Sequence, residues 1–185
     1  GMVTNDFISA WFALFPFLLG LLVLSLFAFL AAVYLTNETD DPALQEDFRL
    51  RALVSGAVVG IFAFLTLLAA RSGAPRLFSG LSQYWWAWLG QAVTGLVSVG
   101  AMAAMWKRWY GVARLLAIAQ VTAMILGWGV AQFPFIVPPD LTFAATAAPD
   151  SVLKPVFVIL IIGILLIVPA FAFLYYTFSN NPQSK

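Results

Sequence analysis

The sequence predicts an all-α membrane protein, a bundle of about five transmembrane helices. Of the 185 residues, 63% are hydrophobic and only 9% are charged, whereas an ordinary soluble domain is roughly 45–50% apolar and about 25% charged. The charged residues are also clustered, and five long uncharged runs lie between them. A chain with so little polar surface cannot cover a water-soluble fold, so the lipid bilayer is its expected surroundings.

Each of the five uncharged runs is expected to be a helix. Even the shortest is long enough to cross a hydrocarbon core of about 30 Å at about 1.5 Å per residue. None shows the period-2 alternation of a strand, and a helix satisfies its backbone hydrogen bonds within the bilayer. We therefore expect a single transmembrane helical domain over residues 1–185, with spans near 11–35, 51–71, 84–106, 110–132 and 154–178.

The lysine and arginine residues predict the orientation of the chain, because cytoplasmic connections are enriched in them. Three lie on the side of the N-terminus and six on the opposite side. The three are Arg71, Arg76 and Lys154, and the six are Arg49, Arg51, Lys107, Arg108, Arg114 and Lys185. We therefore expect the C-terminus to be cytoplasmic.

The composition argues against several classes of function. The chain has no histidine and no cysteine, which are the usual ligands of haem, copper, zinc and iron–sulfur clusters. We therefore expect no catalytic residue, metal site or cofactor in this chain. A net charge of +1 without a basic stripe argues against a nucleic-acid partner. No charged residue lies at the centre of a span, which disfavours a proton pump or an ion-coupled transporter.

The connection between the first two spans contains a predicted helix start. Asp41 precedes Pro42, a pair typical of an N-cap followed by proline at the first helical position. The acidic cluster of Glu38, Asp40 and Asp41 could also bind a cation. Its spacing fits no calcium loop, so capping and solvation are the favoured interpretation.

Small residues form regular patterns on two predicted helices. Gly56 and Gly60 form a G-x-x-x-G pattern, and Ala123 and Gly127 belong to a stripe that also contains Gln120. Such stripes let helix backbones approach closely, and polar side chains within them bond across the interface. The predicted helix-packing residues are therefore Gly56, Gly60, Ala123 and Gly127. Gln120 is expected to join helices, although it could instead line a quinone or proton path.

The segment "GWGVAQFPFIVPPDLT", residues 127–142, ends the fourth span with many special residues. Gly127 and Gly129 are expected to allow close contact around Trp128. Gln132 is placed where the helix meets water, and Pro134 cannot extend that helix. Pro138 and Pro139 are expected to stiffen the loop that follows. Asp140 is expected to cap the turn after it.

The stretch "GWGVAQFPFIVPPDLTFAATAAPDSVL" resembles the closing segment of subunit II of cytochrome bd-type quinol oxidases. In that family a G-W-G-x-A-Q-Y-P motif leads into a proline-rich loop, D-L-T and an A-A-A-P stretch. Phe133 stands where tyrosine is common in the family. The segment "AAVYLTNETDDPALQEDFRLRA" also resembles the link between two helices in the shorter members. The matching residues of the closing segment are Gly127, Trp128, Gly129, Ala131, Gln132, Pro134, Pro138, Pro139, Asp140, Leu141, Thr142, Ala147, Ala148 and Pro149.

The resemblance implies a subunit of a respiratory complex in the plasma (inner) membrane that oxidises quinol and reduces dioxygen to water. The haems and the quinol-oxidising loop of the family belong to subunit I, so the expected partner is a haem-bearing subunit I. This chain would supply scaffold and interface, and a bound quinone is left open. Family members have more helices than the five expected here, so we expect the C-terminal part of a longer subunit. The family's acidic proton-path residues would lie in the other part.

Two other functions are compatible with the residues alone. A half-bundle of a transporter or channel would also be apolar and could contain an odd number of helices. A small membrane scaffold without a redox partner would need no catalytic residue either. The resemblance favours the oxidase subunit over both.

Overall fold

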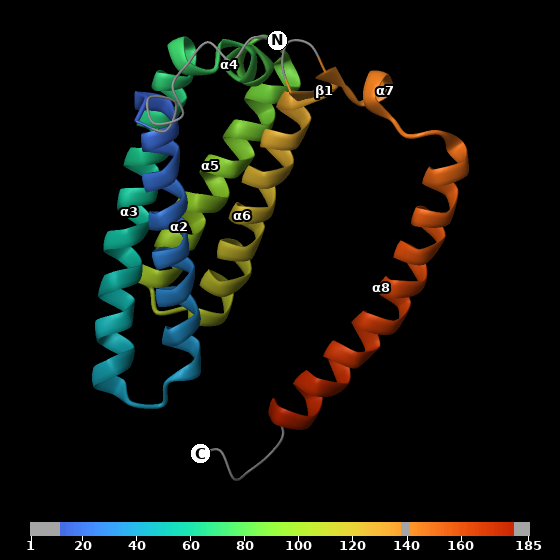
Figure 1. The fold of residues 1–185 in the computed structure, drawn as a ribbon. Helices are drawn as coiled ribbons and strands as arrows, with labels where there is room; N and C mark the ends of the chain where they lie inside the picture. Colours follow the sequence, from blue (N-terminus) through green and yellow to red (C-terminus); the bar gives the residue numbers. More distant parts are fainter. Residues whose placement is uncertain (1–11, 138–140, 180–185) are drawn as a thin grey trace. The chain divides into compact units, whose positions relative to one another are not determined.

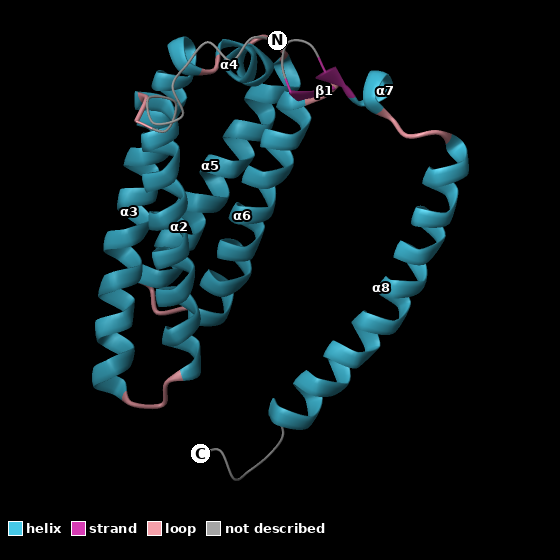
Figure 2. Ribbon diagram, in the orientation of Figure 1, coloured by secondary structure: helices cyan, strands magenta, loops and turns pink. Residues whose placement is uncertain are grey.

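A computed structural model of the chain describes residues 12–137 and 141–179. The chain divides into two compact units, residues 1–140 and 141–185. Helices make up almost all of the described part (Figures 1 and 2). Five of them are long and apolar enough to cross a membrane, so the predicted all-α membrane fold with five spans is confirmed. The single transmembrane domain stays a prediction.

The first unit contains four long helices that run side by side and a short helix across one end of them (Figure 1). The helix α2 packs on α3, and α5 packs on α6. The short helix α4 contacts α3, α5 and α6. The elements of this unit are α2 (Leu14–Glu38), α3 (Pro42–Gly73), α4 (Pro75–Ser82), α5 (Trp85–Trp106), α6 (Tyr110–Gln132) and β1 (Phe135–Val137).

The second unit contains β2 (Leu141–Thr142), α7 (Phe143–Thr146) and α8 (Asp150–Ser179). The Thr142 hydroxyl accepts a hydrogen bond from the Ala145 amide and so caps α7. An ion pair of 3.4 Å joins Lys154 to Asp150 in the first turn of α8. Apolar side chains then follow around the whole helix, which is typical of a helix surrounded by lipid or by other helices.

The predicted spans agree best with the structure for α5 and α6. The helix α3 begins at Pro42, nine residues before the predicted span, because its first turns are polar. The predicted cap is confirmed: Asp41 Oδ1 accepts a hydrogen bond of 2.8 Å from the Ala43 amide. The helix α8 begins four residues before its predicted span, and α2 begins three residues after its own. The short helix α4 was not predicted.

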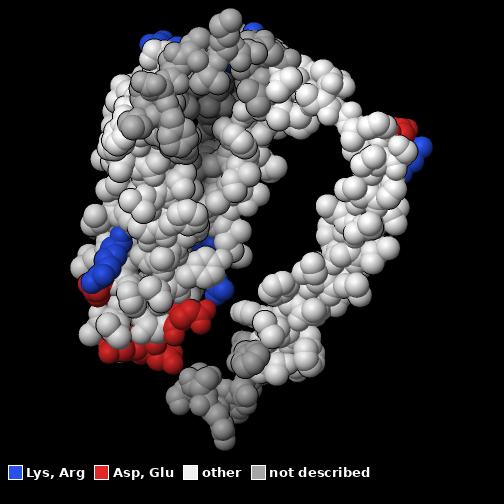
Figure 3. Space-filling view, in the orientation of Figure 1, with Lys and Arg blue, Asp and Glu red and all other residues white. Residues whose placement is uncertain are grey.

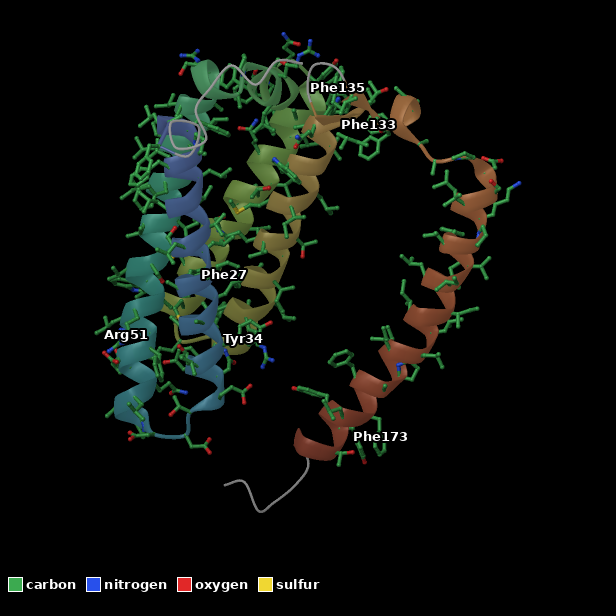
Figure 4. All side chains as sticks on the ribbon, viewed as in Figure 1. Phe27, Tyr34, Arg51, Phe133, Phe135 and Phe173 are labelled. Carbon is green, nitrogen blue, oxygen red and sulfur yellow. The ribbon has the colours of Figure 1, made fainter. Side chains whose placement is uncertain are left out.

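The core of the first unit lies between the two helical hairpins. Phe29 and Val33 of α2, Val59 of α3 and Met105 of α5 are almost fully buried there. Buried alanines of α3, α5 and α6 surround them and permit close helix approach. Large apolar side chains such as Phe27 point outward instead (Figure 4), as expected for a protein surrounded by lipid.

Polar contacts join the two hairpins at the end opposite α4. The Asn37 amide donates to the Tyr110 carbonyl at 3.2 Å, and Arg114 forms an ion pair of 3.4 Å with Glu38. The Arg114 guanidinium also lies over the Tyr34 ring, 4.5 Å from its centroid. Acidic side chains gather at this end of the unit (Figure 3). Of the acidic cluster, Asp41 caps α3, as the sequence favoured, and Glu38 forms an ion pair that the sequence did not predict.

Candidate functional site

The G-W-G-x-A-Q motif lies at the α4 end of the first unit, on the last turns of α6. The helix ends at Gln132, as predicted, and the Phe133 amide still donates to the Gly129 carbonyl at 3.2 Å. Pro134 has no amide hydrogen with which to continue the helix, and the Phe133–Pro134 peptide bond is cis. Strand β1 follows directly, and Phe133 and Phe135 lie at this end of the unit (Figure 4).

The short helix α4 closes this end of the unit. Pro75 occupies its first position, where no amide hydrogen is needed. A Cβ atom on Gly80 would collide with the carbonyl oxygen of Ala131 on α6, so α4 and α6 touch backbone to backbone. A Cβ atom on Gly73 would similarly collide with Phe15 of α2. Because these two glycines have no side chain, the α3–α4 connection can pack closely against α2 and α6.

A cavity of about 1060 Å³ lies between the α3–α4 turn, α4, β1 and the end of α6. We call it the head cavity. Its polar side chains include Arg76, Gln83, Tyr84 and Gln132. Tyr84 stacks on Trp86 with ring centroids 5.4 Å apart, and Arg76 lies over the Phe135 ring, 4.9 Å from its centroid. The motif therefore forms one wall of a partly polar cavity.

Gln132 has an unusual environment in this wall. Its Oε1 atom is buried and has no hydrogen-bond partner among the described residues. A buried amide oxygen without a donor costs about 1–3 kcal/mol, and such atoms are rare in native structures. The sequence placed Gln132 where the helix meets water. The residue lines the head cavity, and its buried oxygen is an acceptor without a donor in the described part of the chain.

A second cavity, of about 910 Å³, lies between α3, α5 and α6. We call it the trough. It shares Phe15, Leu77, Trp86, Trp128 and Val130 with the head cavity, so the two are neighbours. The residues that line it are mainly apolar, and several are glycines: Gly60, Gly90, Gly95 and Gly127.

The glycines predicted to pack helices differ from one another. Gly56 does make a close approach, because an added Cβ would meet Met102 of α5 and lie 3.1 Å from the Phe29 ring. Added Cβ atoms at Gly60, Gly127 and Gly129 would meet nothing within 4 Å in the described part of the chain. Within the described residues, Gly127 and Gly129 therefore do not make the close contact that was expected around Trp128. Gly60 and Gly127 border the trough instead.

The remaining predicted positions have mixed outcomes. Ala123 lines the trough and is partly buried, and Gln120 is buried on α6. Their packing role, like that of Gly60 and Gly127, stays a prediction. Pro138, Pro139 and Asp140 lie outside the described residues. Within 12–137 and 141–179 no group of three or more potential metal ligands occurs, and the absence of a cofactor stays a prediction.

Sequence reasoning missed most of the head cavity because it missed α4. A signal was present: Pro75 follows the apolar run of α3 in the same way that Pro42 starts it, and proline favours a first helical position. In the sequence, Arg76 contributed only to the prediction of membrane orientation. Gly80 belonged to no small-residue pattern that would have predicted a helix contact. Thr66 of α3 was also missed; it is 7% exposed, lines the trough, and its hydroxyl has no partner among the described residues.

Comparison with known proteins agrees with the resemblance seen in the motif. The sequence model of the family described as cytochrome bd terminal oxidase subunit II matches residues 1–178. Searches of curated proteins and of solved structures gave no match. The family match covers the motif, the head cavity, the trough and all five apolar helices. The chain therefore belongs to the cytochrome bd terminal oxidase subunit II family.

Proposed function

We propose that this chain is a haem-free subunit of a bd-type oxidase that oxidises quinol and reduces dioxygen to water. The family match is the observation that carries the proposal. The absence of histidine and cysteine from the sequence supports a haem-free chain. The haems then reside in the subunit I partner, and the role of this chain is scaffold and interface.

The distribution of apolar surface supports the scaffold role. In the first unit, large apolar side chains point away from the core on all four long helices, among them Phe27, Phe64, Leu96 and Leu115. The helix α8 is apolar all around its axis. Such surfaces suit contact with lipid and with the helices of another membrane subunit. Transmembrane subunits associate through this kind of packing, which needs no catalytic group.

The haem content of the purified protein tests this proposal. Produced alone, the chain is expected to show no Soret absorbance, because it lacks the usual axial ligands. Produced together with the subunit I of the same oxidase, it is expected to co-purify with haem in fixed proportion. A stoichiometric Soret band on the isolated chain would contradict the haem-free assignment. Failure to retain subunit I in mild detergent, with both chains well expressed, would contradict the scaffold role.

The proposal includes an orientation in the plasma (inner) membrane with a cytoplasmic C-terminus. The charge bias supports it, since the topology predicted from the sequence puts six of the nine basic residues on that side. A green fluorescent protein fused after Lys185 is expected to fluoresce, and an alkaline phosphatase at the same point is expected to be inactive. The same reporters fused after Ser82, at the end of α4, are expected to give the reverse pattern. Active phosphatase after Lys185 would invert the assignment.

A further inference from the structure

We propose that the head cavity and the trough together form a binding site for one glycerophospholipid, whose headgroup carries a hydrogen-bond donor. The phosphate lies at Arg76, the headgroup donor at Gln132, and the acyl chains along the trough. This site goes beyond the proposed oxidase function and does not depend on it. The juxtaposition of a partly polar cavity with an apolar one is the first observation that supports it.

The two cavities match the two parts of an amphipathic molecule. Each has a volume near the upper end of the roughly 300–1,000 Å³ typical of ligand sites. They adjoin along five shared residues, so one molecule can occupy both. Trp86 and Trp128 line both cavities and Tyr84 lines the head cavity, and such aromatic rings favour the depth of the lipid headgroups. The head cavity therefore lies at the level where a phosphate belongs.

The charge at this end fits a phosphate. Arg76 lines the head cavity, and its fork of donors can hold a phosphate through two hydrogen bonds. Within residues 12–137 and 141–179, neither Arg76 nor Arg71 forms an ion pair with a carboxylate, although each lies over an aromatic ring. A quinone carbonyl can accept one hydrogen bond from a guanidinium, whereas a phosphate can accept two and also carries the opposite charge. Arg76 thus favours a phospholipid as the occupant.

Two buried polar atoms supply the remaining contacts. The Gln132 oxygen can only accept, so it requires a donor such as the ammonium of ethanolamine or a hydroxyl of glycerol. The Thr66 hydroxyl lines the trough about 10 Å along α3 from Gly73, at about 1.5 Å per residue. It can donate to an ester carbonyl at the top of an acyl chain. The open faces of Gly60 and Gly127 in the trough leave room for the chain itself.

Lipid titration of the delipidated full chain, followed by native mass spectrometry, tests the site. The lipids are palmitoyl-oleoyl phosphatidylethanolamine, which has a headgroup donor, and the phosphatidylcholine with the same chains, which has none. The wild type is expected to bind one phosphatidylethanolamine, and to bind it more tightly than phosphatidylcholine. Arg76→Gln is expected to weaken both by about tenfold, as for loss of a charge-assisted contact. Arg71→Gln is the matched control, because Arg71 lies outside the cavity lining, and its affinities are expected to stay within about twofold of wild type.

Two further variants separate the headgroup contact from the chain contact. Gln132→Leu is expected to remove the preference for phosphatidylethanolamine, and Gly127→Leu to weaken both lipids alike by filling the trough. Equal affinities for Arg76→Gln and Arg71→Gln would overturn the proposal, as would an unchanged preference in Gln132→Leu. Displacement of the phospholipid by an equimolar quinone would also overturn it. If Arg76→Gln does not fold, the Gln132→Leu variant tests the proposal alone: loss of the preference for phosphatidylethanolamine supports the site, and an unchanged preference overturns it.

Discussion

Replacing Phe29 with alanine is expected to be among the most destabilising single changes in the first unit. Phe29 is 1% exposed and belongs to the core between the hairpins, with Gly56 against its ring. Phenylalanine-to-alanine changes cost about 3–5 kcal/mol in soluble cores. Lipid tails are as apolar as the protein core, so moving the side chain between them changes the free energy little. The cost of the substitution in a membrane protein is therefore mainly the loss of packing contacts. We expect a loss of about 2–3 kcal/mol.

The matched control is Phe27→Ala on the same helix. Phe27 is 65% exposed and points outward (Figure 4), so its loss removes little packing within the chain. Thermal unfolding of the two variants in detergent is the measurement. A clearly lower midpoint for Phe29→Ala than for Phe27→Ala is the expected result. Equal midpoints would show that the described core does not hold the hairpins together.

Replacing Gly80 with valine is expected to separate α4 from α6. The first added carbon collides with the Ala131 carbonyl oxygen, which is backbone and cannot rotate away. Overpacking of this kind costs about 1–3 kcal/mol. The head cavity depends on the same contact, so phospholipid binding is expected to fall together with the unfolding temperature.

Gly20→Val is the control for Gly80→Val. An added Cβ at Gly20 of α2 meets nothing within 4 Å among the described residues, and valine is no worse than glycine within a helix. Its midpoint is therefore expected to equal or exceed that of wild type. If both valine variants unfold at the wild-type temperature, the contact between α4 and α6 is not the one described.

The sequence predicted the spans well because each span is decided locally. Uncharged length alone identifies a helix that crosses a bilayer, and α5 and α6 end where charges and Pro134 end their runs. The predicted span of α3 begins nine residues after the helix itself, because the first turns, with Glu46 and Asp47, are charged and hydropathy identifies the lipid-facing part of a helix rather than its whole length. The cap at Asp41 was read correctly from two adjacent residues.

The candidate site was harder to predict because it depends on tertiary contacts. The motif residues were found, but their surroundings were not, because Arg76 belongs to a short helix without a long apolar run and Tyr84 lies just after that helix. A glycine pattern also does not tell a packed face from an open one. Gly56 and Gly60 are one helical turn apart, and only Gly56 meets a neighbour within the described chain. That difference depends on which helix faces each position.

The polar contacts between the hairpins make their association sensitive to ionic strength. The apolar core holds the two hairpins together, and two ion pairs, Glu38 with Arg114 and Glu46 with Arg108, add to this joint at an end that electrolyte can reach. Dissolved salt screens such charges beyond about 8 Å at physiological concentration, and more strongly as it rises. The apolar core is not screened. High salt therefore loosens the joint between hairpins while leaving each hairpin intact.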